Sequence, residues 1–433
     1  MTGPSLRVSD GPAVRRDLAL ATWGLFVGLA LLMLAGGLFG TLVAVRSEKV
    51  GLPTGVSSLI AASYYVGFLV GSRLTLRALG MVGHIRVYSA LASLLAAATV
   101  AVGITNDPAS WALLRLVTGL CTAGLYVIAE SWLNDLATNE NRGRLLAVYG
   151  VVAMSFFGVG QVLLFNFDPR AVTGFAVAAI ITSLAVAPVA LSEKAVAPNL
   201  HEAEHISLRE LARVVPTGVF SCLLVGVAHG AISGMAAIYA TRVGLSPGRV
   251  GLFVALPSLG GVLLQWPISA ASDDIDRRAV GFVTAAGAAV VAALLVLDSP
   301  NKTMAFVLFG LLGGLSFPLY SIAAAYTNDW IEQAHLNAAA SQLVTLYGMG
   351  AVIGPFVAAG SMIVLGPRGF LWAIFGLHVV VSLFFLYRML AWRLPLAKRP
   401  WSEVSLPARA FFVPATIIAM SHRRRRRRTD GAE

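Results

Sequence analysis

Glu130 is the only carboxylate that lies well inside one of the long apolar runs of this chain, in the run that begins near Trp111. A charge at the centre of a helix in lipid costs roughly 2.5–3.5 kcal/mol, so such a group usually faces a cavity or a partner. We therefore consider Glu130 as a site for a proton or for substrate. A structural ion pair or hydrogen bond to a neighbouring helix, and an interfacial position near water, are the alternatives.

Arg115 lies near the opposite end of the same apolar run. In a helix, the distance between Arg115 and Glu130 is about 22 Å, so the two side chains cannot pair directly. A guanidinium at this depth either serves a functional site in the interior or extends its long side chain to the lipid headgroups. Both interpretations stay open.

Further polar side chains are spread over the other apolar runs. His229 lies near the middle of its run, and the nearby glycines, Gly226, Gly230 and Gly234, let helix backbones approach closely. This histidine is either a hydrogen-bonded packing residue or a proton carrier. The other candidates for binding substrate or protons are Tyr126, Tyr320, Gln161, Gln265 and Gln342, and packing is the alternative for the tyrosines.

Membrane helices must position these residues. Hydrophobic residues make up 57% of the 433 positions and charged residues 12%, whereas soluble domains hold roughly 25% charged residues. The runs are long enough for helices and lack the alternation of barrel strands. We expect an all-α membrane protein with twelve transmembrane helices, at residues 18–46, 54–76, 87–104, 110–133, 144–165, 172–191, 216–240, 249–271, 280–297, 303–327, 340–365 and 369–392.

An internal repeat divides these helices into two pseudo-symmetric six-helix bundles. Leu125, Tyr126, Ile128, Ala129, Asn134 and Asp135 recur 194 residues later as Leu319, Tyr320, Ile322, Ala323, Asn328 and Asp329. Parallel halves around a shared central site are typical of transporters. The predicted units are a segment at 1–17, a bundle at 18–191, a linker at 192–215, a bundle at 216–392 and a basic tail at 393–433. The linker's second part predicts a short surface helix with Leu208, Leu211, Val214 and Val215 on one face.

Charge sets the expected orientation. Lys and Arg are more frequent in the loops on the side of the two termini, with or without the tail, so both termini are expected in the cytoplasm. The preference for Arg over Lys indicates a GC-rich bacterial source and so the inner membrane. Six consecutive arginines, Arg423 to Arg428, follow a short apolar run that cannot span a bilayer. We expect this tail to bind anionic lipid and not nucleic acid.

Several motifs resemble those of the major facilitator superfamily. The run from Gln265 to Arg278 resembles the family's loop of a glycine, an aspartate and paired basic residues, although Ser269 replaces the glycine and Asp274 a basic residue. In the first half, Leu79 stands where the aspartate is expected. Arg115-x3-Gly119-x3-Ala123 resembles the family's arginine motif, and the runs ESWLND and NRGRLLAVYG are similar to a YcaD-like subgroup.

The resemblance implies roles for the loop residues. Asp273 would dock at the start of the fifth helix, around residues 141–144, and Arg277 or Arg278 would pair with Asp329, which together form a latch that breaks when the halves rock. A solvated loop that only sets topology is the alternative. The resemblance also places Arg115 in a central cavity, where it can attract anionic groups. Helix packing is expected at Gly119, Gly350, Gly354 and Pro355, with a kink at the proline.

The function predicted from these features is secondary active transport of a small organic, possibly amphipathic, solute by alternating access, coupled to protons through Glu130. A passive facilitator, and a non-transporting ligand sensor or lipid-handling protein on the same scaffold, are the alternatives. No phosphate-binding G-x4-G-K-[ST] motif and no metal-ligand spacing occurs in the sequence. We therefore expect no enzyme activity, no cofactor, no metal and a monomeric protein.

Overall fold

The computed structural model describes residues 12–136, 142–191, 206–297, 302–332 and 335–391. Within these ranges, every regular element is a helix, and twelve spans are long and apolar enough to cross a membrane. This confirms the predicted all-α membrane fold. The predicted tail with Arg423 to Arg428 and the first part of the linker lie outside the described residues.

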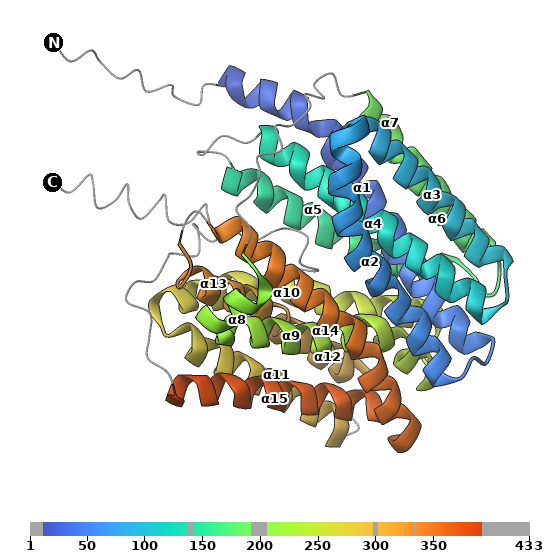
Figure 1. Cartoon of the computed structure of the whole chain (residues 1–433). Helices are drawn as coiled ribbons and strands as arrows, with labels where there is room; N and C mark the ends of the chain where they lie inside the picture. The colour runs from blue at the N-terminus through green and yellow to red at the C-terminus, as the bar shows by residue number, and fades with distance from the viewer. Residues whose placement is uncertain (1–11, 137–141, 192–205, 298–301, 333–334, 392–433) are drawn as a thin grey trace, which may run out of the picture.

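The two halves lie side by side, the first in blue and green and the second in yellow and orange (Figure 1). The first half contains α1 (Pro12–Lys49), α2 (Thr54–Val82), α3 (His84–Ile104), α4 (Pro108–Leu136), α5 (Arg142–Val162), the 3-10 helix η1 (Leu163–Asn166), α6 (Thr173–Leu184) and α7 (Val186–Ala190). The second half contains α8 (Leu208–Val214), α9 (Pro216–Arg242), α10 (Pro247–Asp274), α11 (Arg277–Leu297), α12 (Lys302–Ser316), α13 (Pro318–Asn328), α14 (Leu336–Leu365) and α15 (Gly369–Ala391).

Equivalent helices pack in equivalent pairs within each half. In the first half, α1 packs on α5, α2 on α4 and α3 on α6, and in the second half α9 packs on α14, α10 on α12 and α11 on α15. Across the halves, α1 contacts α9, α2 contacts α14 and α5 contacts α10. This arrangement is the pseudo-symmetry that the 194-residue repeat predicts.

Glycines that recur with this repeat lie where the helices cross. A Cβ atom added to Gly67 or Gly119 would collide with the backbone of the facing helix in the α2–α4 pair. Of their repeat mates, Gly313 would meet the backbone of α10 in the same way, and Gly261 would meet the side chain of Phe317, which directly follows α12. Small residues let backbones approach closely in a membrane, where apolar burial does not drive helices together. The added Cβ atom would meet Leu116 at Gly67, Tyr64 at Gly119, Phe317 at Gly261 and Pro257 at Gly313.

Two glycines of α14 give a matched test of this packing. A Cβ on Gly354 would meet the backbone carbonyl of Val227 in α9, whereas Gly360 has open space around it. We expect Gly354→Ala to lower the free energy of unfolding by about 1–3 kcal/mol through overpacking, and Gly360→Ala to be neutral or slightly stabilising. Thermal melting of the two purified variants measures the difference. Equal melting temperatures would contradict close packing at Gly354.

The two ends of the molecule differ in how the halves are joined. We call the end where α1 begins and α15 ends the terminal end, and the opposite end the distal end. At the distal end, one cluster of buried apolar residues contains members of both halves, among them Leu42, Phe175, Ile232 and Phe309. At the terminal end, each half has its own cluster, one around Ile128 and one around Ile322. Among the described residues, the halves therefore share an apolar core at the distal end, whereas each half has its own core at the terminal end.

Two local features differ from the expectations. The tenth span divides into α12 and α13 because Pro318 has no backbone N–H to continue the helical ladder. The predicted linker helix forms as α8, and Ser207 caps it by accepting a hydrogen bond from the Glu210 backbone N–H. Leu211 and Val215 are buried, but Val214 is 47% exposed, so the apolar face is narrower than predicted.

Candidate functional site

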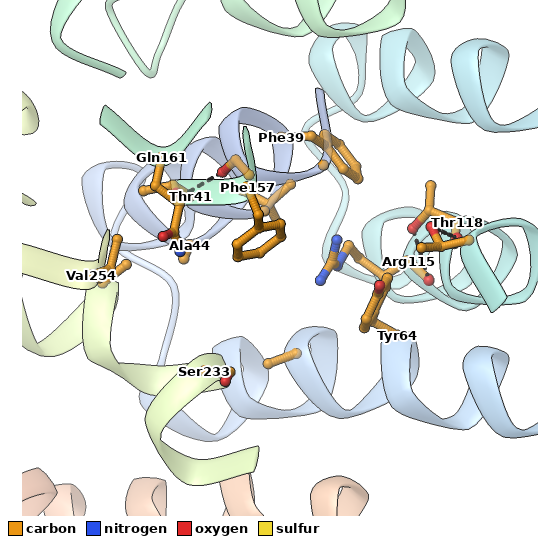
Figure 2. A pocket seen from close by; sticks show the side chains of 18 of the residues that line it. Phe39, Thr41, Ala44, Tyr64, Arg115, Thr118, Phe157, Gln161, Ser233 and Val254 are labelled. Atoms are coloured by element: carbon orange, nitrogen blue, oxygen red, sulfur yellow. Dashed lines mark hydrogen bonds between the residues drawn. The ribbon is translucent and has the colours of Figure 1, made fainter. Parts of the chain in front are cut away.

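A cavity of about 130 Å³ lies between the two halves. Its walls come from α1 to α6 of the first half and from α9, α10 and α12 of the second, and Figure 2 shows part of this lining. Of the predicted site residues, Arg115, Tyr126 and Gln161 line this cavity. The Tyr65 hydroxyl hydrogen-bonds to Ser233 of α9, so the halves also touch through polar groups here.

One face of α4 carries a polar stripe along the cavity. Arg115, Thr118, Thr122 and Tyr126 all line the cavity, at intervals of three or four residues. Since a helix repeats every 3.6 residues, these positions share one face, and Glu130 is the next position on it. The stripe therefore connects a cation near the distal end with a carboxylate near the terminal end.

Arg115 is held by aromatic rings and not by a carboxylate. Its guanidinium carbon lies 4.5 Å from the ring centre of Tyr64 and 5.4 Å from that of Phe39, distances at which cations are attracted to ring faces. Its Nε atom is buried and has no hydrogen-bond partner among the described residues. No Asp or Glu appears in the cavity lining that the structure describes, and Arg115 is the only charged residue in it.

The equivalent face of the second half is mostly apolar. A shift of 194 residues converts the α4 stripe into Phe309, Leu312, Ser316, Tyr320 and Ala324. Phe309 lines the cavity, and so does Phe317 at the break between α12 and α13. The polar stripe of α4 thus has a mostly apolar counterpart in the second half.

Glu130 is 4% exposed. Its carboxyl group interacts electrostatically with the hydroxyls of Tyr126 and Tyr320, which are repeat mates on opposite halves. The Tyr320 hydroxyl is buried and has no hydrogen-bond partner among the described residues, and such a group is a common place for an ordered water. Glu130 therefore lies between the halves, one helical turn beyond the cavity residue Tyr126.

The remaining predicted site residues lie elsewhere in the described structure. His229 is 2% exposed, and its ring nitrogens lie 3.0 Å from the Tyr347 hydroxyl and 3.0 Å from the Ser316 carbonyl oxygen. These contacts fit a neutral imidazole that donates to the carbonyl and accepts from the tyrosine. Gln265 donates to Ser269 in its own helix, and Gln342 donates to the carbonyl of Ile206.

The predicted latch residues gather at the terminal end of the second half. Arg277 donates through Nε to Asp329, at 2.7 Å, and through Nη1 to Asp273, at 3.2 Å. Arg278 pairs instead with Asp276 and donates to the carbonyl of Arg388. The expected docking of Asp273 onto residues 141–144 involves side chains outside the described set.

An ion pair joins the two halves at the distal end. Arg242, the last residue of α9, donates to Glu48 near the end of α1, at 2.8 Å, and to Thr54 of α2, at 2.7 Å. Glu48 and Arg242 are separated by 194 residues, so they are repeat mates. Mates that touch each other lie at the pseudo-two-fold axis, where like charges would repel. The opposite charges at this repeat position therefore attract each other across the two halves at the distal end.

The sequence contained a signal for several cavity residues that we did not select. Thr118 and Thr122 belong to the same helical face as Arg115 and Glu130, and the spacing alone shows this. Phe39 and Phe157 give no such signal, because apolar residues in a membrane helix face lipid and cavity alike.

Comparison with known proteins agrees with this architecture. The sequence profile of the Major Facilitator Superfamily matches residues 25–246 and 218–429. YcaD of Salmonella typhimurium, described as an uncharacterised MFS-type transporter, is 30% identical over 348 residues, which cover 78% of this chain and 88% of that protein. A protein of Enterobacter sp. (strain 638) with the same description has the same identity and coverage.

Solved structures share the fold. The nucleoside transporter NupG has a TM-score of 0.70 and 12% identity, over 86% of this chain and 100% of that one. A bacterial homologue of the human lysosomal transporter Spinster, in an inward-facing and occupied conformation, has a TM-score of 0.71 and 12% identity, over 89% of this chain and 98% of that one. With the family profile and the relatives, they establish that the chain belongs to the major facilitator superfamily, in its YcaD-like group of membrane transporters.

Proposed function

We propose that this protein is a secondary active transporter that moves a small amphipathic organic solute by alternating access, coupled to protons through Glu130. The observation that carries the proposal is the cavity between the halves, with the polar stripe of α4 on one wall and Phe309 and Phe317 on the other. An amphipathic solute fits such a lining better than a sugar, which needs many polar contacts.

The asymmetry of the two ends supports a rocking mechanism. Among the described residues, the apolar core that the halves share lies at the distal end, and the Glu48–Arg242 pair bridges them there. With both termini in the cytoplasm of a bacterial cell, as the excess of Lys and Arg on that side favours, the terminal end faces inward. The conformation then corresponds to the inward-facing state, and opening outward requires the distal contacts to break.

Net solute flux in proteoliposomes tests the proposal. Labelled amphipathic solutes, first selected because they raise the melting temperature of the purified protein, should accumulate when a pH gradient is imposed. Accumulation should stop when a protonophore collapses the gradient. Flux that ignores the gradient would instead support a passive facilitator, and binding without flux would support a ligand sensor or a lipid-handling protein.

The distal ion pair gives a separate prediction. Glu48→Arg places two arginines at the axis, so the distal end should open more often. The exposed fractions of the pair are about one fifth, and pairs this accessible contribute about 0.2–1 kcal/mol. We therefore expect a cysteine placed in the cavity by Ser57→Cys to react about 1.4- to 5-fold faster with an impermeant maleimide from the distal side.

The reciprocal exchange provides the control for this prediction. Glu48→Arg combined with Arg242→Glu restores opposite charges at the axis and should return the labelling rate toward that of the Ser57→Cys parent. The native cysteines, Cys121 and Cys222, are buried and should add little background. An unchanged rate in the single variant, or a double variant as fast as the single one, would show that this pair does not control the distal end.

A further inference from the structure

The charge of the cavity points to the chemical class of its occupant. Resting on the proposed transport function, we propose that the cavity binds an organic monoanion built of one carboxylate and one ring. The carboxylate binds the Arg115 guanidinium, and the ring packs among the aromatic side chains that line the cavity. Four observations carry this assignment: an uncompensated cation, its direction, the volume of the cavity and the chemistry of its two walls.

Arg115 brings a positive charge into the cavity without a matching negative one. The described lining contains no other charged residue, and none of the ion pairs between described residues includes Arg115. Contacts with the faces of Tyr64 and Phe39 offset only part of the cost of taking a cation out of water. An anionic ligand supplies the missing charge.

The guanidinium is oriented to receive such a ligand. Figure 2 shows its nitrogen atoms pointing into the pocket, toward Phe157 and away from the backbone of α4. Its buried Nε is without a partner among the described residues. Arginine presents parallel N–H groups that match the two oxygens of a carboxylate. The neighbouring Thr118 does not compete for the ligand as a donor, because its hydroxyl donates to the Arg115 carbonyl at 2.9 Å.

The charge and the volume together limit the ligand. A phosphate monoester carries about −1.5 to −2 charges at neutral pH, so one arginine would leave part of its charge uncompensated in surroundings of low polarity. A carboxylate carries one charge and is matched by Arg115 alone. The cavity of about 130 Å³ is close to the volume of about 150 Å³ that holds one benzene molecule in an engineered protein cavity.

Aromatic side chains from both halves surround the space beside the cation and suit the ring of such a molecule. Phe39 and Phe157 lie beside Arg115 in Figure 2, and Phe309 and Phe317 line the cavity from the second half. Gln161 adds one neutral polar group whose Oε1 has no hydrogen-bond partner among the described residues. A ring substituent that donates a hydrogen bond, such as a hydroxyl, could therefore be recognised at this side chain.

Thermal melting of the purified full-length protein tests the assignment with benzoate and three compounds of the same ring: benzamide, benzylamine and phenyl phosphate. Benzoate should raise the melting temperature most, because only it combines the ring with a single negative charge. Arg115→Gln should weaken benzoate binding about 10- to 100-fold, as expected for loss of a charged hydrogen bond. Arg115→Lys keeps the positive charge but lacks the parallel N–H groups of arginine, so it should give an intermediate loss of benzoate binding. Arg249→Gln removes an exposed arginine outside the cavity lining and should leave benzoate binding unchanged.

Two results would overturn the assignment. The first is that benzamide or phenyl phosphate binds the wild-type protein as tightly as benzoate does, a comparison that needs no variant. The second is that a folded Arg115→Gln protein binds benzoate as tightly as the wild-type protein does. Flux assays separate this inference from the proposed function. Benzoate binding that depends on Arg115 but gives no flux supports the anion site and contradicts transport. Coupled flux of neutral or cationic solutes without benzoate binding contradicts only the anion site.

Discussion

Accumulation of solute driven by a pH gradient is expected to disappear when Glu130 is replaced by glutamine. A gradient of one pH unit stores about 1.4 kcal/mol per proton, which supports about tenfold accumulation if one proton moves with each solute molecule. Glutamine has nearly the same shape as glutamate but cannot bind and release a proton. The accumulation ratio of Glu130→Gln proteoliposomes should therefore fall to about one at any imposed gradient.

The position of Glu130 explains why coupling should fail while binding survives. Glu130 does not line the described cavity, whereas Tyr126, one turn earlier on α4, does. The carboxyl group interacts with Tyr126 and with Tyr320 of the other half, so in the proposed mechanism its surroundings would change when the halves rock. A carboxylate that moves between wetter and drier surroundings changes its proton affinity, and this change would link protonation to the conformation of the halves.

Solute exchange at equal pH separates loss of coupling from loss of fold. Glu130→Gln should still exchange labelled for unlabelled solute across the membrane and should still show the ligand-induced rise in melting temperature. Glu130→Asp retains an ionisable group and should recover part of the accumulation. Glu210→Gln in α8 removes an exposed carboxylate and serves as the matched control. Normal accumulation in Glu130→Gln would place the coupling proton on another residue.

The number and type of helices could be predicted from the sequence because lipid leaves the backbone few choices. Every polar backbone group must be satisfied within its own segment, so a long apolar run becomes a helix. The division into two parallel halves could also be predicted from the sequence, because the repeat preserves the crossing glycines Gly67 and Gly119 as Gly261 and Gly313. The break at Pro318 was harder to predict from the sequence, since proline is tolerated in transmembrane helices and does not always divide them.

The rotation of each helix was the part that the sequence left undetermined. In a water-soluble protein, apolar residues mark the buried face, but a helix in lipid is apolar on both faces. Gln265 and Gln342 were therefore predicted as site residues, although neither lines the described cavity. The exception is the polar stripe of α4, because polar residues at helical spacing indicate a face that is turned away from lipid. This stripe consists of Arg115, Thr118, Thr122 and Tyr126.

The repeat also contains information about where the two halves touch. Glu48 and Arg242 occupy the same position in the two halves and carry opposite charges. Two mates can meet only at the axis that relates the halves, and opposite charges let mates at that axis attract each other. A comparison of mates also shows that the two halves line the cavity differently, because the mate of Arg115 is Phe309.

Loss of Arg277 is expected to have the largest effect on stability. Arg277 and Asp329 are each 1% exposed, and the Nε–Oδ2 distance is 2.7 Å. Removing one partner from a buried ion pair costs about 3–5 kcal/mol, because the remaining charge stays in surroundings that cannot solvate it. Arg277→Met should therefore lower the melting temperature strongly and reduce the yield of folded protein.

The adjacent arginine and a double variant make this prediction specific. Arg278 pairs with Asp276, which is 19% exposed and can be hydrated when its partner is removed, so Arg278→Met should cost less than Arg277→Met. Arg277→Met combined with Asp329→Leu removes both charges of the buried pair and should recover much of the stability, as apolar replacements of buried pairs often do. If the double variant melts no higher than Arg277→Met, the buried charge on Asp329 is not the cause. The contacts of Arg277 with Ser272 and Asp273 would then account for the loss, since both variants lack them.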